Sequence, residues 1–87
     1  MKGPKFEMND FVLINFEFAH KQIREPWVGQ VEGIVNDTYY MKCLSDDYAS
    51  STRIPFLFDK MMVKIKKKNV DKTIKAIRIL YGKNTIS

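Results

Sequence analysis

The chain has 87 residues, enough for one domain with a modest core, and this favours a binding surface over a catalytic cleft. A content of 45% hydrophobic and 29% charged residues excludes a disordered chain, and no run reaches the roughly 18 apolar residues that cross a bilayer. The net charge of +5 is uneven, because residues 1–50 carry −3 and residues 51–87 carry +8.

These bounds predict an intracellular protein without a membrane partner, nuclear in a eukaryote and otherwise cytoplasmic. The N-terminus lacks the apolar core and cleavage site of a signal peptide. The excess of positive charge in the second half indicates an anionic partner for that half.

The N-terminal third predicts an arm, a strand and a loop. Residues 1–8 predict an arm that is ordered only if its two apolar residues, Phe6 and Met8, dock. The run 11–18 is rich in β-branched and aromatic residues and predicts the first strand, and its poor alternation indicates a strand covered on both faces or bent. A polar stretch then ends at Pro26, which predicts a loop boundary.

A β-hairpin is predicted at the centre of the chain. Its strands span residues 27–35 and 38–44, and the Asn36-Asp37 pair between them tolerates positive φ and forms tight reversals. In the second of these strands one face holds Tyr39, Met41 and Cys43, and the other Tyr40, Lys42 and Leu44.

The first strand of the hairpin is expected to bend. Strict alternation places Trp27 and Val31 on one face and Ile34 on the other. Glycines weaken a strand, so Gly29 and Gly33 indicate tight curvature or close approach of another backbone. Both features are typical of a small, strongly curved barrel.

Two further strands are predicted in the second half. Residues 53–58 resume the apolar run after a polar loop, and Pro55 indicates a sheet edge or a bend there. Residues 61–66 alternate, which predicts a half-buried strand with Met61, Val63 and Ile65 inward and a basic outer face.

A C-terminal helix is predicted over residues 69–82, followed by a tail over 83–87. Apolar residues recur at helical spacing, with basic residues on the other side; they are Val70, Ile74, Ile77 and Tyr81. An additional strand is the alternative, because alternate residues from 73 to 81 also share one strand face.

The order of elements resembles that of small barrels of the Src-homology-3 architecture. Three segments resemble the opening strands of Tudor-like and related chromatin-associated barrels, and also segments of transposon-derived proteins: Asn9–Ile14 (NDFVLI), Trp27–Val31 (WVGQV) and Tyr39–Leu44 (YYMKCL). The resemblance covers residues 9–66. It implies a mainly β fold, a five-stranded SH3-like (Tudor-like) barrel over 9–68 with a short C-terminal α-helix.

No catalytic constellation is visible. The single histidine, His20, falls in a predicted loop, and there is no metal-spaced Cys/His cluster, phosphate-cradling glycine loop or nucleophile elbow. The Asp46-Asp47 pair offers too few oxygen ligands for a cation site. We therefore expect a non-enzymatic domain without metal or cofactor.

The basic residues near the C-terminus predict a nucleic-acid-binding surface, for DNA or RNA. Nine lie within residues 60–83, and such a stripe neutralises phosphates with an affinity that falls steeply with salt. Tyr40 and Tyr48 could stack on single-stranded bases. A solvated lysine face without a ligand is the alternative. The expected contact residues are Lys64, Lys66, Lys67, Lys68, Lys72, Lys75 and Arg78.

The Tudor-like resemblance implies a second kind of site, an aromatic cage for a methylated lysine or arginine of a chromatin protein or peptide. The matching candidates are Trp27, Tyr40, Tyr48 and Phe56, with Tyr39 and Phe58 as alternates and Asp46 or Asp47 beside them. The phase that Trp27 shares with Val31 argues instead for a core indole. A third reading is an adaptor or inhibitor that uses exposed apolar groups; the candidates are Ile54, Leu57, Met61, Met62 and the apolar side of residues 70–81.

Overall fold

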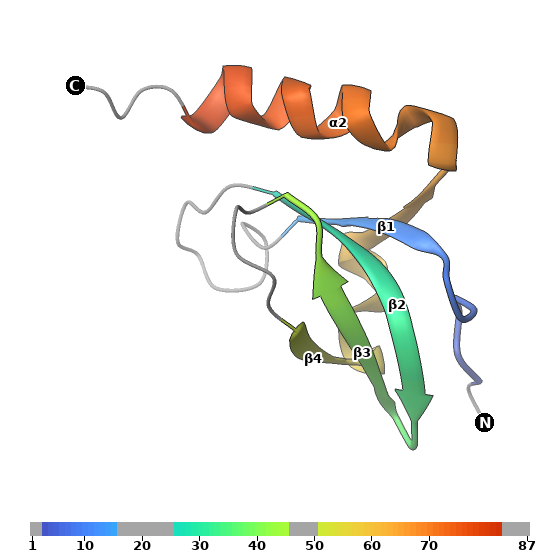
Figure 1. The fold of residues 1–87 in the computed structure, drawn as a ribbon. Coiled ribbons are helices and arrows are strands. Elements are labelled where there is room, and N and C mark those ends of the chain that lie inside the picture. The colour runs from blue at the N-terminus through green and yellow to red at the C-terminus, as the bar shows by residue number, and fades with distance from the viewer. Residues whose placement is uncertain (1–2, 16–25, 46–50, 83–87) are drawn as a thin grey trace.

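The fold is one antiparallel sheet of five strands crossed by a C-terminal helix (Figure 1). The computed structural model describes residues 3–15, 26–45 and 51–82. The strands are β1 (Phe11–Ile14), β2 (Trp27–Val35), β3 (Thr38–Cys43), β4 (Ser51–Pro55) and β5 (Met62–Ile65), in the order β4-β3-β2-β1-β5. The predicted mainly β fold of five strands and a C-terminal helix is confirmed, and the sheet is open, with β4 and β5 at its two edges.

The central hairpin, β2 and β3, matches its predicted position, with Asn36 at a φ of 53° in the turn. The register shifts between Val31 and Gly33, where Glu32 is an extra residue on β2. Because such a bulge sets two residues opposite one, Val31 and Ile34 both pack on the core side. The predicted placement of Ile34 on the face opposite Val31 is therefore wrong.

The main core lies on one face of the sheet, and the N-terminal arm closes over it. Phe6 is only 2% exposed, whereas Met8 is half exposed, so one of the two apolar arm residues docks. The Tyr39 hydroxyl accepts the backbone N–H groups of Lys5 at 2.6 Å and Phe6 at 3.1 Å. The buried members of this core are Phe6, Val12, Ile14, Val31, Tyr39, Met41, Ile54, Phe56 and Met62.

The other face of the sheet is covered by the helix α2 (Val70–Ile77), which continues into a π-helical turn, η3 (Arg78–Gly82). Val70 and Ile77 are buried against Val28 of β2. The partly buried residues of this second cluster are Phe11, Leu13, Leu44, Ile65, Ile74 and Tyr81. The helical spacing is thereby confirmed over the alternative strand. Within the described ranges, no helix is long and apolar enough to cross a membrane.

Coverage on both faces explains the sequence of β1. Val12 and Ile14 belong to the main core, while Phe11 and Leu13 pack against the cluster beneath α2. A strand buried on both sides has no polar face to alternate with, which accounts for its continuous apolar run.

The predicted strand over 53–58 is wrong in its second half. β4 ends at Pro55, and residues Phe56–Met61 form a 3-10 helix, η1. Proline has no N–H to extend the ladder, and the next N–H, that of Phe56, donates to the Asp37 carbonyl at 2.8 Å. The expectation that Pro55 lies at a sheet edge is confirmed, because β4 is an edge strand.

The predicted phase of the last strand is also wrong. Met62 is 1% exposed and belongs to the main core, whereas Val63 is 58% exposed. Ile65 packs under α2 on the opposite face. The two faces of β5 thus serve two different clusters, so alternation alone could not show which residues point inward.

Candidate nucleic-acid interface

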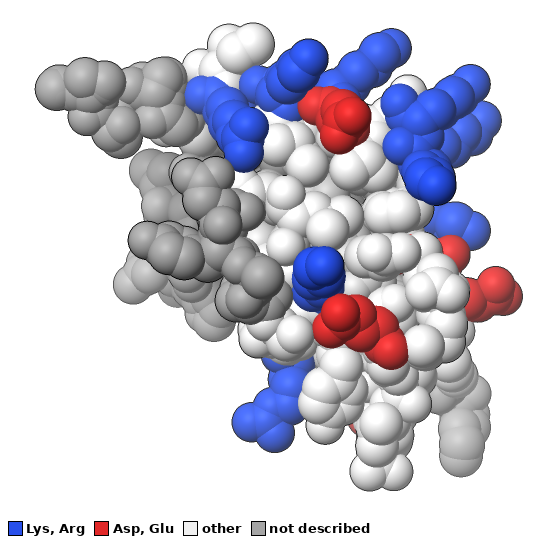
Figure 2. All heavy atoms as spheres, viewed as in Figure 1, with Lys and Arg blue, Asp and Glu red and all other residues white. Residues whose placement is uncertain are grey.

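The basic side chains of α2 lie on its outer side, since its apolar side chains pack against the sheet. Val70, Ile74 and Ile77 turn toward β2 and β1, and at 3.6 residues per turn Lys72 and Lys75 then face solvent. Figure 2 shows Lys and Arg side chains gathered over α2 and the turn that precedes it. We call six exposed residues the basic helix surface: Lys66, Lys67, Lys68, Lys72, Lys75 and Arg78.

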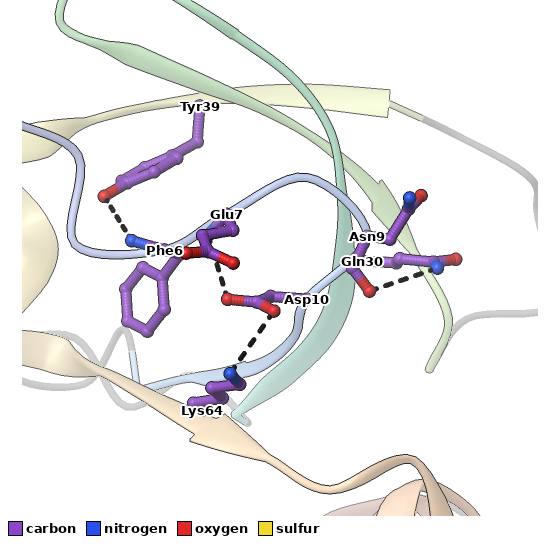
Figure 3. A network of polar contacts seen from close by, with 7 residues as sticks. All are labelled: Phe6, Glu7, Asn9, Asp10, Gln30, Tyr39 and Lys64. Atoms are coloured by element: carbon purple, nitrogen blue, oxygen red, sulfur yellow. Dashed lines mark hydrogen bonds and ion pairs between the residues drawn. The ribbon is translucent and has the colours of Figure 1, made fainter.

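Lys64, a seventh predicted contact residue, lies apart from this surface. It pairs with Val12 in the sheet and so belongs to the face opposite α2. Its ammonium lies 3.5 Å from the Asp10 carboxylate, which also accepts the Glu7 N–H at 2.9 Å (Figure 3). Lys64 therefore helps to hold the turn between the N-terminal arm and β1.

The basic helix surface has little negative charge to balance it. Asp71 is the one acidic residue between positions 60 and 87. Within the described residues, none of the five lysines of this surface makes an ion pair. Lys72 and Lys75 lie three residues apart on α2, where like charges repel, and Lys68 lies in the 3-10 turn just before the helix. An anionic ligand would relieve that repulsion.

The face of the sheet on the α2 side continues beyond the helix as a polar surface. Register places Lys42 beside Gln30, and Tyr40 between Gly33 of β2 and Arg53 of β4. Lys42 and Arg53 are exposed, and Tyr40 is half-buried. Lys42 and Arg53 are not among the predicted contact residues. Alternation along β3 predicts that Lys42 lies on the same face as Tyr40. The position of Arg53 beside Tyr40 depends on how β4 pairs with β3, which the sequence does not show.

The predicted aromatic-cage residues are not brought together in the described part of the chain. Phe56 lies in the main core at 8% exposure, with its ring centroid 4.6 Å from that of Tyr39. Trp27 packs against the same core, while Tyr40 lies on the opposite face of the sheet. Tyr48 lies outside the described residues.

In the described residues, no group of three or more His, Cys, Asp or Glu side chains could hold a metal ion. His20 and the Asp46-Asp47 pair lie outside the described ranges, and the Cys43 thiol is buried, with its sulfur 3.7 Å from the Ser45 hydroxyl oxygen. Comparison of the chain with protein-family models, curated proteins and solved structures found no match. Function must therefore be inferred from charge and geometry.

Proposed function

We propose that this protein is a non-enzymatic module that binds nucleic acid, on its own or in chromatin, through the basic helix surface. The observation that carries the proposal is the gathering of six exposed cationic side chains around one helix whose apolar side is buried. A phosphate backbone is the extended polyanion that such a row of cations fits.

The helix α2 holds two of these cations, Lys72 and Lys75, in a fixed arrangement, and the other four flank it in the turns before and after. Residues three or four apart on a helix stand about 5–6 Å from one another at Cβ, and α2 is anchored by two buried residues, Val70 and Ile77. Binding then costs little ordering of the backbone, because the row exists before the ligand arrives. The affinity is electrostatic and insensitive to base sequence.

We further propose that the open sheet is a half-closed barrel of the SH3-like, Tudor-like class. The strand order supports this, because β1 pairs with both β2 and β5, so that the first and last strands in the sequence are neighbours in the sheet. The bulge at Glu32 supports it as well, since bulges increase strand curvature.

Neutralising the basic turn before α2 tests the proposal. We expect the triple variant Lys66→Gln, Lys67→Gln, Lys68→Gln to bind a labelled 12-nucleotide DNA more weakly in fluorescence anisotropy. The slope of log affinity against log salt concentration should become less negative by roughly 2, since each lost phosphate contact on a single strand removes about 0.7 from the slope.

A pair of single variants supplies the matched control. Lys75→Gln and Lys60→Gln remove the same charge, but Lys60 lies on η1, which packs against the main core on the far side of the sheet from α2. Only Lys75→Gln should weaken binding. Equal effects of the two variants would indicate that net charge alone attracts the DNA, and would count against a defined surface.

A protein-interaction domain is the alternative, and exposed apolar side chains favour it. Leu57, Ile79 and Leu80 are 72%, 75% and 71% exposed. Apolar docking is screened little by salt, whereas phosphate binding weakens steeply, so a partner held undiminished at high salt would support the alternative.

A further inference from the structure

We infer that the nucleic acid is single-stranded, and that one unpaired base stacks on Tyr40 at the exposed face of the sheet beside α2. This inference rests on the proposed function and names the class of nucleic acid. It is drawn from a row of three residues on adjacent strands, Gly33, Tyr40 and Arg53, that lie side by side in register.

The row leaves one flank of the tyrosine open. Gly33 has no side chain, and a Cβ there would lie 3.7 Å from the Cβ of Tyr40, in ordinary contact with it. On the other flank, Arg53 is exposed, and its planar guanidinium can stack on a base or an aromatic ring. A flat ligand is the shape that this row accommodates.

The charged side chains near Tyr40 favour different parts of a nucleotide: a lysine suits a phosphate and a carboxylate suits a base. Lys42 lies two residues from Tyr40 along β3, about 7 Å away, on the side toward α2, and is exposed. Glu32 is exposed near the row, and it accepts a hydrogen bond from the Ser51 hydroxyl at 3.2 Å across β3. A carboxylate there repels a phosphate but accepts an N–H of a base edge, such as the amino group of cytosine.

A single-stranded nucleic acid whose phosphates contact the basic helix surface and Lys42 would thus bring one of its bases to Tyr40. In a duplex the bases are stacked on one another and paired, so that no ring face is free for a side chain. Stacking of an unpaired base on an aromatic side chain needs no particular base sequence.

Substitution of Tyr40 tests this inference with a labelled 12-nucleotide oligo-dC and a 12-base-pair duplex in anisotropy titrations. Wild type should bind the single strand more tightly. Tyr40→Leu removes the ring face and should weaken single-strand binding by about 5- to 100-fold, while the affinity for duplex and the slope with salt stay unchanged. Tyr40→Phe keeps the ring face and should bind as wild type does.

An independent measurement needs no variant. In proton NMR of the wild-type protein, the ring protons of Tyr40 should shift upfield on addition of the oligo-dC, and those of Tyr39, which is fully buried in the main core on the opposite face of the sheet, should not. The NMR result stands even if Tyr40→Leu fails to fold.

The outcomes separate the two proposals. Salt-dependent binding that is equal for single strand and duplex and unaffected by Tyr40→Leu would overturn the stacking inference and leave the proposed function in place. Absence of binding to either oligonucleotide at low salt would overturn both. An unshifted Tyr40 ring in a saturated complex would overturn the stacking inference alone.

Discussion

Tyr39 connects the N-terminal arm to the sheet through a single hydroxyl group. Tyr39→Phe leaves two backbone N–H groups, those of Lys5 and Phe6, without their acceptor. We expect a loss of about 1–3 kcal/mol in the free energy of unfolding, measured by urea denaturation, because the Phe6 N–H is buried and an unsatisfied buried donor is costly. Tyr40→Phe, on the outer face, should stay within about 0.5 kcal/mol. Equal losses would contradict this role for the hydroxyl.

The same hydroxyl makes stability depend on pH. Burial raises the pKa of Tyr39 above its ordinary value of 10.0, since the phenolate is poorly solvated there, and the Asp59 carboxylate adds to the rise. The folded protein therefore binds this proton more tightly than the unfolded chain does. Its stabilising contribution is complete below the unfolded pKa and is lost as the pH rises through the folded one.

This pH dependence is measurable as a difference between two proteins. As the pH rises above about 10, the free energy of unfolding of the wild type should fall more steeply than that of Tyr39→Phe, which lacks the titrating group. Parallel curves would show that other groups account for the alkaline loss.

The two strand glycines have different roles, although the sequence marks them alike. A Cβ at Gly29 would lie 2.8 Å from Trp27 Cζ3 and 3.1 Å from the Lys42 carbonyl oxygen, whereas one at Gly33 meets nothing closer than 3.7 Å. We expect Gly29→Ala to lower the thermal midpoint, at a cost of about 1–3 kcal/mol, because the Lys42 backbone cannot readily move away. Gly33→Ala should be nearly neutral, and a reversed order would contradict the close approach.

At the scale of elements, α2 is held by a few apolar side chains. Ile77 is 6% exposed and packs over Val28, whereas Ile79, two residues further on, is 75% exposed. Ile77→Ala should therefore cost about 2–4 kcal/mol in urea denaturation, and the matched Ile79→Ala less than about 0.5 kcal/mol. Similar costs would mean that the helix packs with a different face against the sheet.

The central hairpin and the helix could be predicted because their sequence signals are local. The strand over 27–35, the Asn36-Asp37 turn and the 3.6-residue spacing of Val70, Ile74 and Ile77 each lie within one element. The bulge at Glu32 depends on how β3 pairs with β2, and the end of β4 on a hydrogen bond to the Asp37 carbonyl. Both are tertiary effects that propensity does not report.

The candidate site was predictable in composition but not in layout. Clustered lysines indicate a basic surface, yet the assignment of Lys64 to the opposite face from Lys72 follows only from its pairing with Val12. The row of Gly33, Tyr40 and Arg53 joins three strands, and its register cannot be read from any one of them.

At the scale of the whole molecule, charge and fold divide the chain in the same way. The first 50 residues, with a net charge of −3, supply three strands of the sheet, and the last 37, with +8, supply two edge strands and the helix. Figure 2 shows most of the visible Lys and Arg side chains at the α2 end of the molecule. An anionic partner is expected to approach α2 first.

The most direct test of nucleic-acid binding is the salt dependence of affinity for a labelled 12-nucleotide single strand. Between about 50 and about 200 mM salt, a log–log plot should fall with a slope of roughly −4 if all six side chains of the basic helix surface contact phosphates. The slope should approach roughly −2 in the Lys66→Gln, Lys67→Gln, Lys68→Gln variant. Binding that ignores salt, or no binding at the lowest salt, would contradict the proposal.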